Sequence, residues 1–137
     1  MNPNAIRWEV PLLSTVSVEA TIRYRDGITA VVAGIPHADR LLTEALGLDP
    51  GFLLAQVGLA VARTVDGAPY SPPGSSGARA VTRGERQHAE VVRTALSNDV
   101  VRAADLRREH LVEFPGDLLI VWLPVLAVRL GLGPAVR

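Results

Sequence analysis

Two histidines are placed so that a single helical hairpin would bring them together. If two antiparallel helices meet at a turn near residue 99, residues whose numbers sum to about 198 lie at equal height. His88 and His110 meet this condition, and so do Glu85 and Glu113. A buried histidine beside a carboxylate can exchange protons near neutral pH. The spacing therefore predicts an imidazole pair, with up to two carboxylates, on the facing sides of two helices.

These four side chains admit a catalytic and a structural interpretation. In an enzyme, His88, His110 and Glu85 would be the catalytic acid–base groups, and Glu113 would contact a ligand. In a scaffold, each histidine would bond a backbone carbonyl or a glutamate and would space the helices. The sequence holds no complete set of acid, base and nucleophile at a diagnostic spacing. We favour the structural interpretation and keep the catalytic one open.

The composition excludes several other chemistries. The chain contains no Cys and no Lys, so cysteine nucleophiles, thiolate zinc ligands, disulfides and Schiff-base lysines are ruled out. A metal site would need both histidines with Glu85 or Glu113, but the Glu-x-x-His motif of helical-bundle metal sites occurs only once, at Glu85 and His88. We therefore expect no metal and no cofactor.

Charge and hydropathy argue against nucleic-acid and membrane partners. The 14 basic and 14 acidic residues give a formal net charge of zero. Arg102, Arg107 and Arg108 form a basic patch without interleaved aromatic residues, which is typical of a solvated helix face. The apolar run 118–128 is interrupted by Pro124 and is shorter than the roughly 20 residues of a membrane helix. With no signal-like N-terminus, we expect a cytoplasmic protein.

Apolar periodicity and cap signals predict an all-α chain. Ser17 is a good helix N-cap, and Thr82 with Glu85 has the pattern of a capping box. Asp49-Pro50 has the pattern of an N-cap followed by a first-turn proline, and Gly47 is a candidate C-terminal glycine. The expected helices span residues 17–33, 37–46, 50–65, 82–97, 100–114 and 118–130.

These helices would form one domain of antiparallel hairpins over residues 17–131, with an N-terminal arm at 1–16 and a tail at 132–137. Residues 66–81 contain three prolines and three glycines and are expected to form a mobile loop. Tyr70 lies in this loop, where its phenol could contact a ligand. The loop itself would act as a lid if the protein is an enzyme.

The last expected helix is apolar around nearly its whole circumference, which indicates a helix buried on all sides. Too little chain follows it for another helix pair, so we expect a homodimer to cover its outer face. The alternative is that the N-terminal arm folds back over it within one chain. The candidate interface residues are Leu119, Trp122, Leu123 and Leu126.

Two features resemble known helical repeats. The segment Ala45-Leu46-Gly47-Leu48-Asp49-Pro50, between two short amphipathic helices, is typical of tetratricopeptide repeats. The stretches 81–88, 98–103 and 109–117 together resemble the tetratricopeptide repeat protein 38 family, and the likeness covers roughly residues 15–125. The resemblance implies a superhelical stack of antiparallel hairpins and a protein-binding role.

Two functions follow as expectations. The first is a tetratricopeptide-like scaffold that binds a peptide or protein partner. The second is a small all-α enzyme or small-molecule binder, such as a cyclase or isomerase, in which an apolar pocket holds His88, His110 and Glu85. We favour the scaffold.

Overall fold

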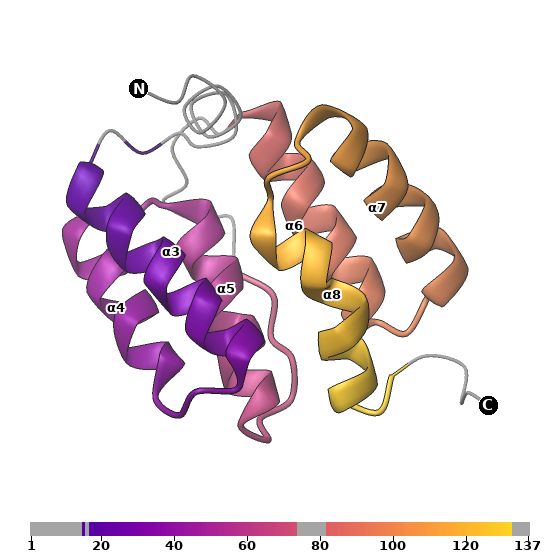
Figure 1. Cartoon of the computed structure of the whole chain (residues 1–137), viewed down its shortest axis with the longest axis horizontal. Helices are drawn as coiled ribbons and strands as arrows, with labels where there is room; N and C mark the ends of the chain where they lie inside the picture. Colours follow the sequence, from indigo (N-terminus) through magenta and orange to yellow (C-terminus); the bar gives the residue numbers. More distant parts are fainter. Residues whose placement is uncertain (1–14, 16, 74–81, 133–137) are drawn as a thin grey trace. The chain divides into compact units, whose positions relative to one another are not determined.

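The computed structural model describes residues 15, 17–73 and 82–132, which form six α-helices and no β-strand (Figure 1). The predicted all-α class is confirmed. These residues fall into two compact units, an N-terminal unit of residues 15–73 and a C-terminal unit of residues 82–132. Most of the expected arm and tail, and residues 74–81 of the expected loop, lie outside the described residues. The helices are α3 (Val18–Ala33), α4 (Ala38–Leu48), α5 (Leu53–Val65), α6 (Arg83–Leu96), α7 (Val100–Glu113) and α8 (Leu118–Arg129).

The N-terminal unit is held together by an apolar core among α3, α4 and α5, which contact one another in all three pairs. Leu42 and Leu54 are fully buried, and Ile28 is nearly so. Gly27 and Gly58 allow the helices to approach closely, because a Cβ on Gly27 would lie 2.7 Å from the Leu42 Cγ. A Cβ on Gly58 would lie 2.8 Å from the Ile28 Cδ1. The apolar side chains of one helix thus fit against the glycines of the next, and this close packing fills the core without polar contacts.

The turn between α4 and α5 differs from the prediction. Helix α4 continues through Gly47 to Leu48, and α5 begins only at Leu53, so the expected helix start at Asp49-Pro50 is wrong. The intervening residues form a turn in which the Phe52 N–H donates to the Asp49 carbonyl at 3.1 Å. This turn carries Phe52 into the core, where it is fully buried and its ring centroid lies 5.2 Å from that of Tyr24.

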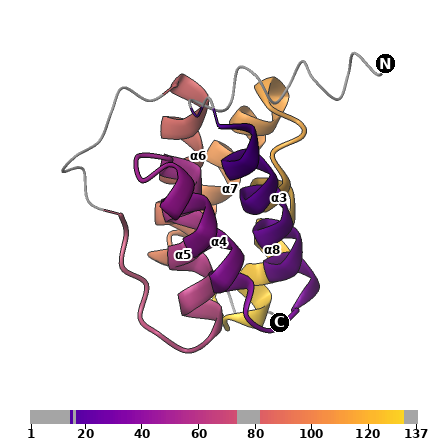
Figure 2. The same ribbon diagram turned by 90° about the vertical axis from the view of Figure 1, so that its left-hand side faces the viewer.

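Figure 2 shows the ribbon from a second direction, with α4 and α5 of the N-terminal unit toward the viewer. In the C-terminal unit, cap chemistry fixes the starts of α6 and α7. Thr82 and Glu85 form the predicted capping box at the start of α6. Asn98 adopts a positive φ of 64° in the turn before α7, a conformation that Asn tolerates better than most residues. Asp99 then caps α7 through the Arg102 N–H. The tight turn makes α6 and α7 an antiparallel pair, against which α8 packs.

Within a single chain, helix α8 is buried on one side and exposed on the other, so the homodimer expected to cover its outer face stays a prediction. Leu119, Leu123 and Leu126 are buried, whereas 42% of Trp122 is exposed. Pro124 lies inside the helix and, having no N–H, leaves a backbone carbonyl without its helical donor. None of the described helices is long and apolar enough to cross a membrane.

The side chain of Arg107 compensates for Pro124. Its Nε donates to the Ile120 carbonyl and its guanidinium NH2 donates to the Val121 carbonyl, each at 2.9 Å. Ile120 lies four residues before the proline, so its carbonyl is the acceptor that a helical N–H at position 124 would have used. The expectation that Arg107 lies on a solvated face is therefore wrong: it is half-buried and joins α7 to α8. Arg102 and Arg108 are exposed as expected.

Candidate functional site: a buried histidine–aspartate cluster

Three titratable side chains meet at one end of the C-terminal unit. His88 lies in the second turn of α6, His110 in the last turn of α7, and Asp117 directly before α8. Their exposed fractions are 0%, 1% and 2%. Each comes from a different helix or helix start, so the cluster links all three helices of the unit. We call these three residues the histidine–aspartate cluster.

One carboxylate oxygen joins the two rings. Asp117 Oδ2 lies 2.8 Å from His88 Nδ1 and 2.7 Å from His110 Nε2. The ring centroids lie 6.4 Å apart in an edge-to-face arrangement, as the predicted hairpin register requires. His110 also packs on Phe114, with centroids 5.1 Å apart. The carboxylate that contacts both rings is thus Asp117.

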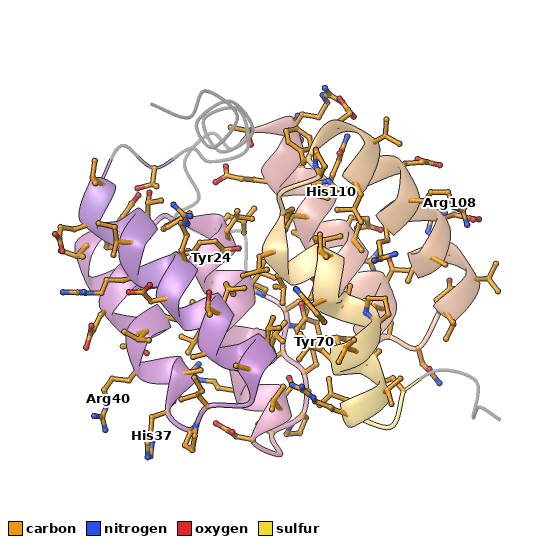
Figure 3. All side chains as sticks on the ribbon, in the orientation of Figure 1. Tyr24, His37, Arg40, Tyr70, Arg108 and His110 are labelled. Atoms are coloured by element: carbon orange, nitrogen blue, oxygen red, sulfur yellow. The ribbon has the colours of Figure 1, made fainter. Side chains whose placement is uncertain are left out.

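A chain of polar side chains connects the cluster to the surface. His110 Nδ1 lies 3.0 Å from the Gln87 Oε1, and the Gln87 Nε2 donates to Glu113 at 3.3 Å. Glu113 is exposed and also accepts from the Arg83 guanidinium at 2.7 Å. The hydrogen bond from Arg83 lowers the pKa of Glu113, so its carboxylate stays an acceptor. Figure 3 shows His110 within this unit, whereas His37 and Arg40 of the N-terminal unit extend outward.

The orientation of Gln87 determines that the Nδ1 nitrogen of His110 carries a proton. Because the Gln87 Nε2 faces Glu113, its oxygen faces His110, and an amide oxygen can only accept a hydrogen bond. His110 must therefore donate from Nδ1, which leaves Nε2 as the lone-pair nitrogen of the neutral ring. That nitrogen lies 2.7 Å from the Asp117 Oδ2, which is itself an acceptor when ionised. A hydrogen bond between these two atoms therefore needs a second ring proton, on Nε2, which makes His110 an imidazolium.

Asp117 is ionised despite its burial. Burial by itself would raise the pKa of this carboxyl group, but the charge of His88 and the hydrogen bonds from both histidines lower it to about 2. The second carboxylate oxygen, Oδ1, is buried without a hydrogen-bond partner, and so is the His88 Nε2. Such atoms are uncommon in folded proteins because an unpaired buried polar group is costly.

The sequence placed the two histidines correctly but assigned them the wrong carboxylate. Glu85 is buried, yet its carboxylate accepts from the Thr82 N–H at 3.0 Å as part of the capping box. Glu113 is on the surface. Asp117 occupies the N-cap position of α8, but its side chain makes no cap hydrogen bond. An aspartate before an apolar helix is the usual cap signal, so the sequence pattern alone could not separate the two uses.

Two cavities among the described residues, one in each unit, lie away from the cluster. In the C-terminal unit, a mostly apolar cavity of about 170 Å³ adjoins Ala103, Arg107 and Pro124. In the N-terminal unit, a hollow of about 550 Å³ adjoins Arg63, Pro69 and Ser71. None of the three cluster residues lines either space, so neither cavity offers a substrate a route to the rings. Tyr70 is half-buried beside the second hollow without lining it.

Three comparisons bear on identity. No family model, no curated protein and no solved structure matches this chain. The likeness to the tetratricopeptide repeat protein 38 family stays a prediction, and the function has to be inferred from the geometry of the described residues.

Proposed function

We propose that this chain is a tetratricopeptide-like helical scaffold that binds a peptide or protein partner through the exposed side of α8. The observation that carries the proposal is a row of exposed apolar side chains on that helix: Leu118, Trp122, Val125 and Val128. Their spacings of four, three and three residues bring them to one side of a helix. We call these four residues the α8 face.

The residue types of the α8 face suit protein recognition. Single exposed apolar residues are ordinary on protein surfaces, but a contiguous row of them favours an interaction site. Tryptophan is among the residue types that contribute most to binding energy when a partner buries them. Trp122 keeps 42% of its surface exposed. The short-turn hairpins α3–α4 and α6–α7, each of which packs closely, are consistent with helical-repeat architecture.

A second copy of the chain is the other partner to consider, as the sequence predicted. Leu119, Leu123 and Leu126 are buried within the chain, so of the four predicted interface residues only Trp122 is available to a partner. A homodimer at the predicted helix would therefore form through the α8 face. Sedimentation equilibrium at micromolar concentration separates a 14.6 kDa monomer from a dimer.

Photo-crosslinking tests the proposal. A benzophenone amino acid replaces Trp122 in the full chain, and Val101, an equally apolar exposed residue of α7, carries it in the matched control. We expect a defined adduct at position 122 that is absent at position 101. The partner, once purified, should bind the Trp122→Glu variant at least tenfold more weakly than wild type and bind Val101→Glu unchanged. Equal adducts at both positions would contradict the proposal, and an adduct containing only a second copy would replace it with the homodimer.

The second function, a small-molecule binder, has one observation in its favour. The apolar cavity of about 170 Å³ in the C-terminal unit is the size of a small aromatic or short acyl group. The guanidinium of Arg107 is already engaged with two backbone carbonyls at its edge. Catalysis by His88 and His110 gains no such support, because both rings are buried.

A further inference from the structure

The histidine–aspartate cluster has the donor set of a metal site. His88 Nδ1, His110 Nε2 and a carboxylate oxygen of Asp117 lie within 4.8 Å of one another and are all buried. Two imidazole nitrogens with a carboxylate are ligands of zinc and related transition metals. Calcium and magnesium, which bind through oxygen atoms, do not fit this set. The sequence expectation of no metal rested on Glu85 and Glu113, whereas the carboxylate that the fold supplies is Asp117.

Two further observations point to a cation. The Gln87 oxygen requires His110 to carry its proton on Nδ1, so the neutral ring directs a lone pair at the Asp117 Oδ2, 2.7 Å away. Two facing acceptors at that distance need either a second ring proton or a metal ion between them. In addition, Asp117 Oδ1 is buried without a partner. The hydrogen-bonded arrangement uses one carboxylate oxygen twice and leaves the other unused.

We propose that the cluster binds one divalent transition metal of the zinc type. The three ligands are His88 Nδ1, His110 Nε2 and the carboxylate of Asp117, whose unpartnered Oδ1 can contact the metal beside Oδ2. The metal takes the place of the proton between His110 and Asp117. Nitrogen and oxygen ligands at about 2.0 Å from a tetrahedral metal lie about 3.3 Å apart. The present separations of 2.7 and 2.8 Å must therefore open slightly on binding.

The role of such a metal is structural. All three ligand residues are buried, so the metal would be shielded from a substrate in solution. The metal would join α6, α7 and the start of α8 within a unit whose described part spans only residues 82–132. Units of this size bury a smaller fraction of their surface than larger domains do, and they gain much from a metal that binds only the folded state. Gln87 acts from outside the site by holding the ring of His110 in the ligating tautomer.

Cobalt and zinc titrations of the full chain test the proposal. After EDTA treatment and dialysis, Co²⁺ is added at neutral pH and the visible absorption of tetrahedral cobalt is recorded, with Zn²⁺ as competitor. We expect one equivalent to bind. We also expect zinc at a hundredfold excess over its Kd to raise the Tm by about 5 °C or more. The His88→Gln, His110→Gln and Asp117→Asn variants should each lose at least about a hundredfold in affinity.

Two further variants keep the test informative if a ligand variant fails to fold. His37→Asn removes the one histidine outside the cluster, at an exposed position whose φ of 68° Asn tolerates. It should bind cobalt as wild type does. Gln87→Met removes no ligand and should weaken zinc binding by about 10- to 100-fold while the helix content stays unchanged. No saturable binding by wild type, or binding lost in His37→Asn and retained in Gln87→Met, would overturn the proposal and leave protons as the only cations in the cluster.

Discussion

The two three-helix units of this chain are stabilised in different ways. In the N-terminal unit, the buried side chains of α3, α4 and α5 are apolar, and Gly27 and Gly58 let the helices approach closely. In the C-terminal unit, buried side chains include every polar or charged residue that the described part of the chain buries: Glu85, His88, Thr94, His110 and Asp117. One unit relies on packing, whereas the other combines packing with directed polar contacts.

This difference predicts how each unit responds to change. An apolar core loses stability in proportion to the contacts removed, and it tolerates substitution by apolar side chains of similar shape. A buried polar cluster depends on every partner, because a single deletion leaves the remaining groups desolvated and unpaired. The C-terminal unit should therefore respond more strongly to single polar substitutions, to acid and to metal than the N-terminal unit.

The largest expected effect comes from removing the carboxylate of the cluster. Asp117→Ala leaves two buried imidazoles without their common acceptor and should lower the free energy of unfolding by about 3–5 kcal/mol. The measurement is urea unfolding in EDTA, so that only protons fill the cluster. Asp105→Ala, at an exposed aspartate paired with Arg108, is the matched control and should change stability by about 0.5 kcal/mol or less. A similar loss of unfolding free energy in both variants would contradict a stabilising role of the cluster.

Next in size is the loss of the Arg107 guanidinium. Arg107→Met keeps much of the aliphatic side chain but removes the hydrogen bonds to the Ile120 and Val121 carbonyls, of which Ile120 has no helical donor because of Pro124. Unfolding free energy should fall by about 1.5–3 kcal/mol. Arg108→Met removes an exposed guanidinium from the same helix and should have little effect. If both variants unfold at the same urea concentration, Arg107 does not compensate for the proline.

The sequence predicted most of the helices because their ends carry local signals. Ser17, Thr82 and Asp99 cap helices through contacts within four residues, and such contacts depend on nothing distant. The facing of His88 and His110 was also predictable, since a short turn sets the register of a hairpin. Local signals thus determined the elements and one pair of neighbours.

The rest depended on contacts between distant residues. The sequence pattern around Asp117 is that of a helix N-cap, and only the packing of α6 and α7 makes it a hydrogen-bond partner of two histidines. The sequence pattern of Arg107 is that of a surface residue, and only the packing of α8 brings the Ile120 carbonyl, freed by Pro124, against it. The helix start predicted at Pro50 failed because the burial of Phe52 set the turn instead. In each case tertiary packing outweighed a local preference.

Acid should distinguish the two units through Asp117. The pKa of this group is about 2 in the folded protein and 3.8 ordinarily. A lowered folded pKa gives stability that is present above the ordinary pKa and is lost as the pH falls through the folded pKa. The stability difference between wild type and Asp117→Asn should therefore shrink by about 2 kcal/mol from pH 5 to pH 2. Chemical denaturation in EDTA at several pH values measures this stability difference. A difference that does not change with pH would contradict the lowered pKa of Asp117.

The smallest expected effect tests the N-terminal unit by glycine substitution. Gly27→Ala adds a Cβ 2.7 Å from the Leu42 Cγ, an atom that cannot move without shifting a fully buried side chain. Overpacking of this kind costs about 1–3 kcal/mol, and alanine returns about 1 kcal/mol through its higher helix propensity, so we expect a net loss of about 1 kcal/mol. Gly47→Ala is the matched control: it also lies inside a helix, but no atom lies within 4 Å of the added Cβ. This variant should gain up to about 1 kcal/mol, and thermal unfolding should show opposite signs for the two substitutions. Equal gains in stability in both variants would mean that α3 and α4 are packed more loosely than the distance to Leu42 requires. The contrast between the two units would then rest on the polar contacts of the C-terminal unit alone.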